Sequence, residues 1–243
     1  MRISRLQFFT SFHSLEANMD LENLRRSYEE NSLESDELAA SPLEQFSIWF
    51  DDAKTRASAD WFEANAMTLA TASKSGQVSA RIVLLKRITD AGFVFFTNYD
   101  SDKATQLSEN PHASLVFYWP HVERQIRIEG TVEKTDAEVS DEYFHARPQG
   151  SQLGAIASPQ SRPIESRETL VQQTMELAKR FRDTEEIPRP DYWGGYLLKA
   201  TRVEFWQGRP SRLHDRFVYA RSTETQPSGE DSTTAWTITR LAP

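Results

Sequence analysis

Residues 67–97, MTLATASKSGQVSARIVLLKRITDAGFVFFT, decide the fold class of this chain. Three runs in this stretch are rich in β-branched and aromatic residues, and short turn signals separate them. Such a pattern predicts neighbouring antiparallel strands joined as a meander. The predicted strands are Met67–Ala72, Val78–Ile88 and Phe93–Thr97, and the turn signals are Ser75-Gly76 and Asp90-Ala91-Gly92.

Further strands and helices extend this pattern over most of the chain. The other predicted strands are Ala113–Trp119, Gln125–Glu133, Gly195–Trp206, Phe217–Arg221 and Ala235–Arg240. The predicted helices are Asp20–Glu30, one that begins at Ser41-Pro42, Ser101–Asn110, Asp136–Ala146 and Ile164–Arg182, with a loop over Arg147–Pro163. Strands that dominate the middle and the end, with helices between them, indicate a β-rich α+β fold built on a closed or nearly closed barrel.

The composition describes a globular chain without a general affinity for nucleic acid. Of its 243 residues, 38% are hydrophobic and 26% charged, and the net charge of -8 opposes binding along a phosphate backbone. No apolar run approaches the roughly 20 residues that span a bilayer. The chain contains no cysteine, which fits a reducing compartment, so we expect a cytoplasmic protein that binds no membrane.

We expect one main domain over residues 19–243 and a disordered or dispensable extension over residues 1–18. The first fifteen residues contain Arg2, Arg5 and several Ser and Thr but no acid, a weak likeness to a transit peptide. Met19 begins a more ordinary start, MDLENLRRSYEE, which favours the simpler interpretation.

The run Arg81–Lys86, RIVLLK, is an apolar strand with a cation at each end. A strand that is apolar on both faces is expected to be buried on both, so its terminal charges need partners. Because side chains alternate between faces, Arg81 and Lys86 need not bind the same anion. Taken alone, charges that flank a core strand and reach water are the simpler explanation.

Tyr143, Arg147 and Ser151 follow one another at intervals of four residues. If the chain is helical up to Ala146, Tyr143 and Arg147 lie on one side of the helix end, with Ser151 in the loop that follows. A phenol, a guanidinium and a hydroxyl together suit a phosphate monoester. An ordinary helix end followed by a polar loop explains this pattern equally well.

The run Val203–Arg216, VEFWQGRPSRLHDR, joins an aromatic strand end to Arg212, His214 and Arg216. In an extended chain these three side chains share one face. Cationic groups that lie together in this way are suited to bind anions or electron-rich rings. No Gly-x-Ser-x-Gly turn accompanies them, and the five histidines of the chain lack metal-ligand spacing. We therefore expect neither a nucleophilic triad nor a metal site.

Several blocks of the chain together resemble the pyridoxamine 5'-phosphate oxidase family. They are Arg81–Lys86, Tyr143–Gly154, Gln160-Ser161-Arg162-Pro163, Val203–Arg216 and the C-terminal Arg240–Pro243, in the family's order. The likeness extends from about Leu24 to the C-terminus. It implies an antiparallel split β-barrel of the FMN-binding type with surrounding helices, assembled as a homodimer with FMN at the interface. The implied activity oxidises pyridoxamine 5'-phosphate and pyridoxine 5'-phosphate to pyridoxal 5'-phosphate, with O2 as acceptor and H2O2 as product.

The resemblance also implies which residues form the site. Arg212 and His214 would lie over the substrate's pyridine ring as the catalytic pair. The implied substrate contacts are Arg25, Tyr28, Lys86, Tyr143, Arg147, Ser151, Arg212 and His214. The implied FMN contacts are Arg81, Ile82, Val83, Leu84, Leu85, Lys86, Phe96, Thr97, Lys103, Gln125, Gln160, Ser161, Trp206 and Arg216.

Two positions depart from the family's usual pattern. Asp102-Lys103 stands where the family usually has Arg-Lys, so a carboxylate replaces a cation near the FMN phosphate. This change weakens flavin binding unless Asp102 turns to solvent or pairs with a nearby cation. Phe96 stands where the family often has Tyr, although a contact made through the backbone survives that change.

Two other classes of function stay open at this point. A split-barrel protein could hold FMN or pyridoxal phosphate without oxidase activity, and Asp102 is the feature that most favours this alternative. A redox enzyme of the same fold could use another flavin or a deazaflavin. The trio Tyr143, Arg147 and Ser151 and the run Val203–Arg216 disfavour that third possibility.

Overall fold

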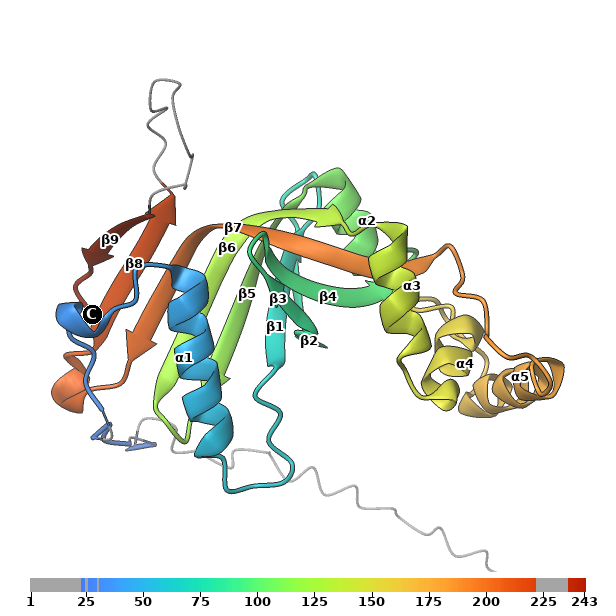
Figure 1. Ribbon diagram of the computed structural model, residues 1–243, viewed down its shortest axis with the longest axis horizontal. Helices are drawn as coiled ribbons and strands as arrows, with labels where there is room; N and C mark the ends of the chain where they lie inside the picture. Colours follow the sequence, from blue (N-terminus) through green and yellow to red (C-terminus); the bar gives the residue numbers. More distant parts are fainter. Residues whose placement is uncertain (1–22, 25, 30, 222–235) are drawn as a thin grey trace, which may run out of the picture.

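A curled antiparallel sheet forms the centre of the molecule (Figure 1). The computed structural model describes residues 23–24, 26–29, 31–221 and 236–243. Within them the strand order is β2-β1-β5-β6-β7-β4-β3, and β8 and β9 continue the sheet from β7. The strands are β1 (Ala66–Ala72), β2 (Val78–Leu84), β3 (Arg87–Thr89), β4 (Gly92–Asn98), β5 (His112–Trp119), β6 (Arg124–Lys134), β7 (Trp193–Gln207), β8 (Asp215–Arg221) and β9 (Trp236–Arg240).

Five α-helices surround this sheet in the described part of the chain: α1 (Pro42–Thr55), α2 (Asp102–Glu109), α3 (Ala137–His145), α4 (Gln149–Ala157) and α5 (Arg167–Arg180). Short 3-10 turns occupy Ser35–Glu37 and Pro210–Arg212. In the described segments, none of the helices has the length and apolar character needed to cross a membrane.

Helix α1 begins where the sequence predicts and covers the main core. The Ser41 side chain accepts a hydrogen bond from the Leu43 amide, and Pro42 occupies the first helical position. Phe46, which is fully buried, meets the rings of Phe93 and Phe117 edge-on at 5.1 and 5.0 Å. Removing such an aromatic side chain from a packed core costs about 3–5 kcal/mol, so this contact fixes α1 against the sheet.

A smaller core lies where α3, α4 and the start of β7 meet. It consists of Phe144, Leu153, Ile187 and Trp193, each at most 6% exposed. The ring of Phe144 packs edge-on against Trp193 at 5.2 Å. These contacts hold the two short helices in place at one end of the sheet.

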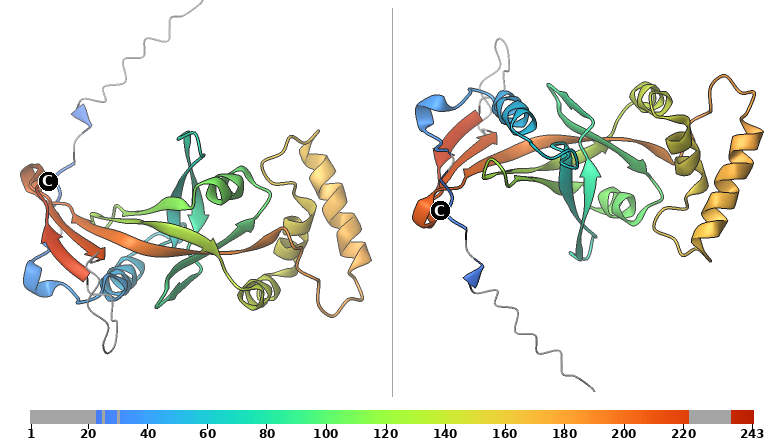
Figure 2. Two further views of the ribbon diagram at one scale, coloured as in Figure 1. Left: turned by 90° about the horizontal axis from the view of Figure 1, so that it is seen from above. Right: turned by 90° about the horizontal axis from the view of Figure 1, so that it is seen from below.

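Strand β7 connects two distant ends of the molecule (Figures 1 and 2). One end carries β8 and β9, and the other carries α3, α4 and α5. The strand has 15 residues, which corresponds to about 45 Å at the usual rise of roughly 3.3 Å per residue. Residues at the start and at the end of β7 therefore belong to separate parts of the surface.

The predicted run Val78–Ile88 is wrong as a single strand. It divides into β2 and β3 at Leu85 and Lys86, whose amides donate to the carbonyl oxygens of Asn65 and Val94. The strands also do not form a simple meander, because β1 pairs with both β2 and β5. The expectation of burial on both faces is wrong within this chain, since Ile82 is 66% exposed.

Two further elements differ from the sequence-based expectation. The predicted loop Arg147–Pro163 contains α4, which its buried Leu153 anchors in the small core. Part of the predicted helix Asp20–Glu30 lies outside the described residues, and residues 26–29 are not helical. The other predicted helices and strands are confirmed within about three residues at each end, although the start of the predicted strand Ala235–Arg240 lies outside the described residues.

Candidate active site

A hydrogen-bonded cluster of polar side chains joins β4, α2 and the loop after α4. The Lys103 ammonium donates to Thr97 Oγ1 at 3.2 Å and to Gln160 Oε1 at 2.6 Å. Thr97 also donates to Gln160 Oε1 at 3.1 Å. Residues 63 positions apart in the sequence thus converge, and all three are among the FMN contacts that the resemblance implies.

Arg81 lies in the same region, on β2. Its guanidinium donates to Thr71 Oγ1 at 2.7 Å, to Ser79 Oγ at 2.6 Å and to the Leu69 carbonyl oxygen at 3.0 Å. All of these acceptors are neutral. Within the described part of the chain, Arg81 and Lys103 are therefore held in place without a carboxylate at hydrogen-bond distance, and an anionic ligand would supply the missing charge.

The two cations affect each other's protonation. Burial and, to a lesser extent, the charge of Arg81 lower the pKa of Lys103 to about 8, while Asp102 opposes the shift. Burial also lowers the pKa of Arg81, again opposed by Asp102. A negative phosphate placed between them would relieve both the desolvation and the repulsion.

A hollow of about 740 Å³ opens beside these cations. Arg81, Lys103, Ser161, Asp102 and Arg162 form part of its wall. Asp102, the departure from the family's pattern, accepts a hydrogen bond from Arg162 Nη1 at 2.9 Å. The carboxylate is thus paired with a nearby cation, one of the two conditions under which flavin binding survives the change.

A second cluster surrounds Arg147, in the short connection between α3 and α4. Its guanidinium lies 4.7 Å from the centre of the Trp193 ring. Tyr143 stacks on Phe96 at 4.0 Å and on Trp193 at 6.1 Å. Burial lowers the pKa of Arg147, and the neighbouring Tyr143 opposes that shift.

Arg147 carries a polar atom that the protein leaves without a partner. Its Nη1 is buried and makes no hydrogen bond to any of the residues that the structure describes. Buried donors of this kind are rare, and a charged one is costly. The arrangement fits an anion that binds beside the side chains of Tyr143 and Arg147.

Ser151 and Lys86 complete the predicted phosphate contacts, with one correction. Ser151 belongs to the first turn of α4 and not to a loop. Both side chains are exposed. Lys86 follows β2, and the neighbouring Arg87 forms an ion pair with Glu142 of α3 at 3.1 Å, which ties this edge of the sheet to the helix that carries Tyr143.

A further group of predicted residues lies at the other end of β7, whereas Ile82, Val83 and Leu84 belong to β2 and Leu85 follows it. Gln125, Trp206 and Arg216 sit opposite one another on β6, β7 and β8. The ring of His214 packs against Trp206 at 4.6 Å. The residues assigned to one FMN site are therefore divided between two distant ends of the folded molecule.

Tyr28 covers this second group of aromatic residues. Its ring meets Trp206 and His214 edge-on, both at 5.7 Å. A Cβ added to Gly208 would lie 2.8 Å from the Tyr28 ring, so only glycine permits this approach. Arg25, the other predicted contact from this segment, lies outside the described residues.

His214 is held in a defined orientation. Its Nδ1 accepts a hydrogen bond from the Arg209 amide at 3.0 Å, which leaves Nε2 to carry the proton of the neutral ring. Burial and then the charge of Arg212 lower the pKa of His214. The ring is therefore a neutral hydrogen-bond donor at neutral pH.

The expectation of an extended run from Arg212 to Arg216 is wrong at its start. Arg212 ends a 3-10 turn, and both Ser211 and Arg212 have positive φ, 58° and 63°. Such backbone costs energy for residues with a Cβ and often occurs at functional sites. Ser161, another predicted contact, has φ of 68°.

Arg216 differs from Arg81, Lys103 and Arg147 because it already has a carboxylate partner among the described residues. Its Nε and Nη2 donate to Glu204 Oε1 at 3.2 and 3.0 Å, and its Nη1 donates to the Ala242 carbonyl oxygen at 2.8 Å. Glu204 is only 2% exposed and also pairs with Arg202 at 3.3 Å. The charge of Arg216 is thus neutralised within the chain.

The sequence analysis missed three residues of these clusters. Trp193 supports Arg147, Glu204 holds Arg216, and Arg162 pairs with Asp102. Trp193 is followed by two glycines and Glu204 stands between apolar strand residues, so both carry a local signal. Arg162 lies in a block that the resemblance includes, but its partner is 60 residues away.

Comparison with known proteins identifies the family of this chain. A family model described as pyridoxamine 5'-phosphate oxidase matches residues 54–180, and one described as pyridoxine 5'-phosphate oxidase C-terminal dimerisation region matches residues 193–243. A pyridoxine/pyridoxamine 5'-phosphate oxidase of Salinibacter ruber is 54% identical over 223 residues, which cover 92% of this chain and 99% of the relative. One from Bordetella pertussis is 54% identical over 225 residues, 93% of this chain and 100% of the relative.

Solved structures show the same fold. PhzG from Burkholderia lata 383, in complex with tetrahydrophenazine-1-carboxylic acid, has a TM-score of 0.77 and 29% identity, covering 90% of this chain and 100% of that one. A pyridoxamine 5'-phosphate oxidase-related, FMN-binding protein from Nostoc punctiforme has a TM-score of 0.62 at 17% identity, covering 85% and 100%. The second likeness concerns the fold alone.

Fold and site together define an FMN-binding flavoprotein with an antiparallel split barrel. The cations Arg81 and Lys103, which lack an acidic partner at hydrogen-bond distance, fit the phosphate of that cofactor. Within that class, the chain belongs to the pyridoxamine 5'-phosphate oxidase family. The C-terminal match is to a dimerisation region and supports a homodimer.

Proposed function

We propose that this protein is an oxidase that converts pyridoxamine 5'-phosphate and pyridoxine 5'-phosphate to pyridoxal 5'-phosphate, consuming O2 and releasing H2O2; with the amine substrate, water is also taken up and ammonia released. Two curated relatives with that oxidase name share 54% of their residues with this chain over nearly its whole length. The observation that carries the proposal is the buried, unpartnered Nη1 of Arg147 beside Tyr143. A substrate with a phosphate monoester would satisfy that atom.

The substrate phosphate is held, in this proposal, by Lys86, Tyr143, Arg147 and Ser151. Trp193 and Phe96 support two of these groups by stacking on them. Anchoring the phosphate restricts the position of the pyridine ring and of its reacting carbon, which lowers the entropy lost in reaching the reactive geometry.

Arg212 and His214 act on the opposite side of the substrate ring. The neutral His214 ring donates from Nε2 to the substrate's oxygen or amine, since its Nδ1 is occupied by the Arg209 amide. Arg212 covers the ring face with its guanidinium. When bound, FMN supplies the redox chemistry, the two-electron oxidation of the substrate carbon followed by reduction of O2.

A homodimer with FMN at the interface fits the division of the assigned residues. Thr97 pairs with Gly194 near the start of β7, Lys103 bonds to Thr97, and Arg81 lines the same hollow as Lys103, whereas Trp206 and Arg216 pair at the other end of β7. Two copies arranged around a two-fold axis would join the first group of one copy to the second group of the other. Tyr28 of each copy would then cover a site that both copies build.

PhzG supports a second candidate, oxidation of a reduced tricyclic acid. That protein has a TM-score of 0.77 with this chain and binds tetrahydrophenazine-1-carboxylic acid. Its identity of 29% is well below the 54% shared with the curated oxidases. Such an acid carries no phosphate monoester. The phosphate contacts assigned to Lys86, Tyr143, Arg147 and Ser151 therefore favour the first proposal.

One experiment separates these proposals from a non-catalytic flavin carrier. Purified protein is loaded with FMN and mixed in air with pyridoxine 5'-phosphate, pyridoxamine 5'-phosphate, unphosphorylated pyridoxine or tetrahydrophenazine-1-carboxylic acid, and peroxide and product are measured. We expect peroxide and pyridoxal 5'-phosphate in equal amounts from the two phosphate esters. Peroxide from the tricyclic acid alone, or none from any substrate, would refute the proposal.

The same assay tests the catalytic pair. Arg212→Ala is expected to lower turnover while the purified variant retains its flavin, because Arg212 is exposed and contacts neither Lys103 nor Arg81. A variant that turns over like the parent would remove Arg212 from the site.

A further inference from the structure

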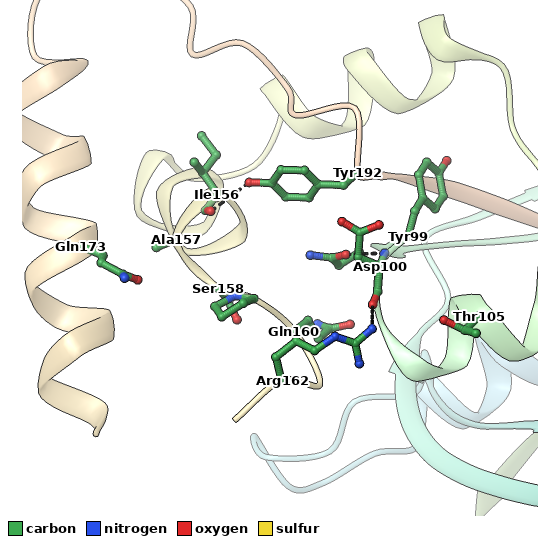
Figure 3. A pocket seen from close by; sticks show the side chains of 12 residues that line it. Tyr99, Asp100, Thr105, Ile156, Ala157, Ser158, Gln160, Arg162, Gln173 and Tyr192 are labelled. Atoms are coloured by element: carbon green, nitrogen blue, oxygen red, sulfur yellow. Dashed lines mark hydrogen bonds between the residues drawn. The ribbon is translucent and has the colours of Figure 1, made fainter. Parts of the chain in front are cut away.

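Arg162 brings a third cationic side chain to the hollow that contains Arg81 and Lys103. It belongs to the loop after α4 and also lines a neighbouring hollow of about 680 Å³, which lies between that loop and the start of α2. Figure 3 shows the Arg162 side chain beside Gln160, with its guanidinium directed toward the segment that carries Asp100. Arg162 thus forms part of the wall between two cavities.

Two acceptors fix this guanidinium. Nη1 donates to Asp102 Oδ1 at 2.9 Å, and Nη2 donates to the Asp100 carbonyl oxygen at 2.8 Å. Both acceptors lie at the first residues of α2 or just before it. Because Arg162 remains half exposed, at 51%, these bonds position it at the rim without removing it from the hollow.

The charge of Asp102 reaches the cations of the hollow. Asp102 raises the pKa of both Arg81 and Lys103, so its negative charge is felt at each of them. An unpaired carboxylate in this position would repel a phosphate that enters between the two cations. Arg162, bonded to that carboxylate, reduces the repulsion.

The start of α2 adds a second reason to expect an anion. The first amides of a helix have no partner within the helix and favour a negative charge. Ser101, the N-cap residue, makes no side-chain bond to them. Asp102 already places a negative charge in this first turn, so its pairing with Arg162 lowers the repulsion that a ligand phosphate meets there.

We propose that Arg162 is a specificity-determining residue for phosphorylated flavin, and that it acts by neutralising Asp102 at the rim of the phosphate site. The chemical group recognised is the phosphate monoester of FMN, which riboflavin lacks. The inference concerns the cofactor only, so it stands or falls independently of which substrate the enzyme oxidises.

Flavin titrations of the apoprotein test this inference, with binding followed by quenching of flavin fluorescence. Arg162→Ser is expected to raise the Kd for FMN about tenfold, the scale of one charge-assisted contact, and to change the Kd for riboflavin less than about twofold. The matched control is Arg182→Ser, an exposed arginine outside the wall of this hollow, which should leave both Kd values unchanged.

The double variant Asp102→Asn/Arg162→Ser tests the mechanism. If Arg162 acts by neutralising Asp102, removing the carboxylate regains at least half of the lost FMN affinity on a logarithmic scale. The inference is overturned if Arg162→Ser binds FMN like the parent, if FMN and riboflavin weaken equally, as a purely structural role predicts, or if the double variant regains nothing.

Discussion

The two ends of β7 carry similar side chains in opposite electrostatic states. At the end with α2, α3 and α4, Arg81, Lys103 and Arg147 have no carboxylate at hydrogen-bond distance among the described residues, and Nη1 of Arg147 is buried without a partner among them. At the end with β8, Arg216 is bonded through two nitrogens to the buried Glu204. The first end therefore leaves the charges of Arg81, Lys103 and Arg147 available for ligands, whereas the charge of Arg216 is neutralised by Glu204, although Arg221 Nε on β8 is also buried without a partner among the described residues.

This difference indicates what each end does. Cations without counter-ions destabilise the folded protein until an anion binds, so the end with Arg147 is arranged for phosphates. The end with Trp206 and His214 presents aromatic surface and a neutral hydrogen-bond donor, which suit a ring. The residues that bind charged groups and the residues that recognise rings thus lie at opposite ends of β7.

The largest expected effect comes from the cation with the unpartnered nitrogen. Arg147→Ala should lower kcat/KM for pyridoxine 5'-phosphate about 100-fold, the scale of losing charge-assisted hydrogen bonds to a phosphate. The thermal midpoint of the substrate-free protein should move by less than about 3 °C, because the lost contacts include a buried charge that was not satisfied. Steady-state kinetics and thermal unfolding measure the two effects.

Arg189→Ala is the matched control for that experiment. Arg189 lies in the same region, but its guanidinium is engaged by Asp141 and by the Trp193 carbonyl oxygen, both at 2.6 Å. We expect this variant to lose stability and to keep KM for the phosphate ester. If Arg147→Ala behaves like Arg189→Ala, the contrast between the two ends is wrong.

A second prediction concerns the cofactor phosphate. Lys103→Gln removes a charge but keeps a hydrogen-bonding side chain beside Thr97 and Gln160. The Kd for FMN should rise about 30-fold, whereas the Kd for riboflavin should change less than about twofold. Equal losses for the two flavins would show that Lys103 only maintains the local structure.

The pH dependence of FMN binding gives a third prediction. The pKa of Lys103 in the free protein is lowered to about 8, so the ammonium is charged below that pH and loses its proton above it. The bound phosphate favours the charged form, and binding above pH 8 therefore requires proton uptake. The Kd for FMN should stay nearly constant from pH 7 to 8 and rise about tenfold by pH 9.5.

Lys103→Arg provides the control for this dependence, since guanidinium keeps its proton throughout that range. Titrations at several pH values in one buffer series should give a flat profile for this variant up to pH 9.5. A parent profile as flat as that of the variant would contradict the lowered pKa.

The smallest effect is expected at the neutralised end. Arg216→Ala should raise the Kd for FMN only about threefold, because the guanidinium is already bonded to Glu204. Its removal leaves Glu204 with Arg202 as a partner, and we expect a loss of about 1–2 kcal/mol in the free energy of unfolding. Denaturant unfolding and flavin content after dialysis measure both, and unchanged flavin content would remove Arg216 from the FMN contacts.

The sequence by itself determined the elements whose signals are local. Helix α1 was predicted from Ser41 and Pro42, and the strand runs were predicted from their residue types, because capping and side-chain alternation depend on neighbouring residues. The family and its cofactor were also predicted from short blocks in a fixed order. Those features depend only on contiguous stretches of the chain.

Only the tertiary structure decided the features that depend on distant partners. Helix α4, QGSQLGAIA, has two glycines and no side-chain cap, yet it forms because Leu153 is buried against α3 and β7. The pairing of Asp102 with Arg162 spans 60 residues, so no local pattern reveals that the unusual carboxylate is neutralised. Charge balance at a site is set by whichever side chains the fold brings together, and the sequence lists these charges without stating which of them meet.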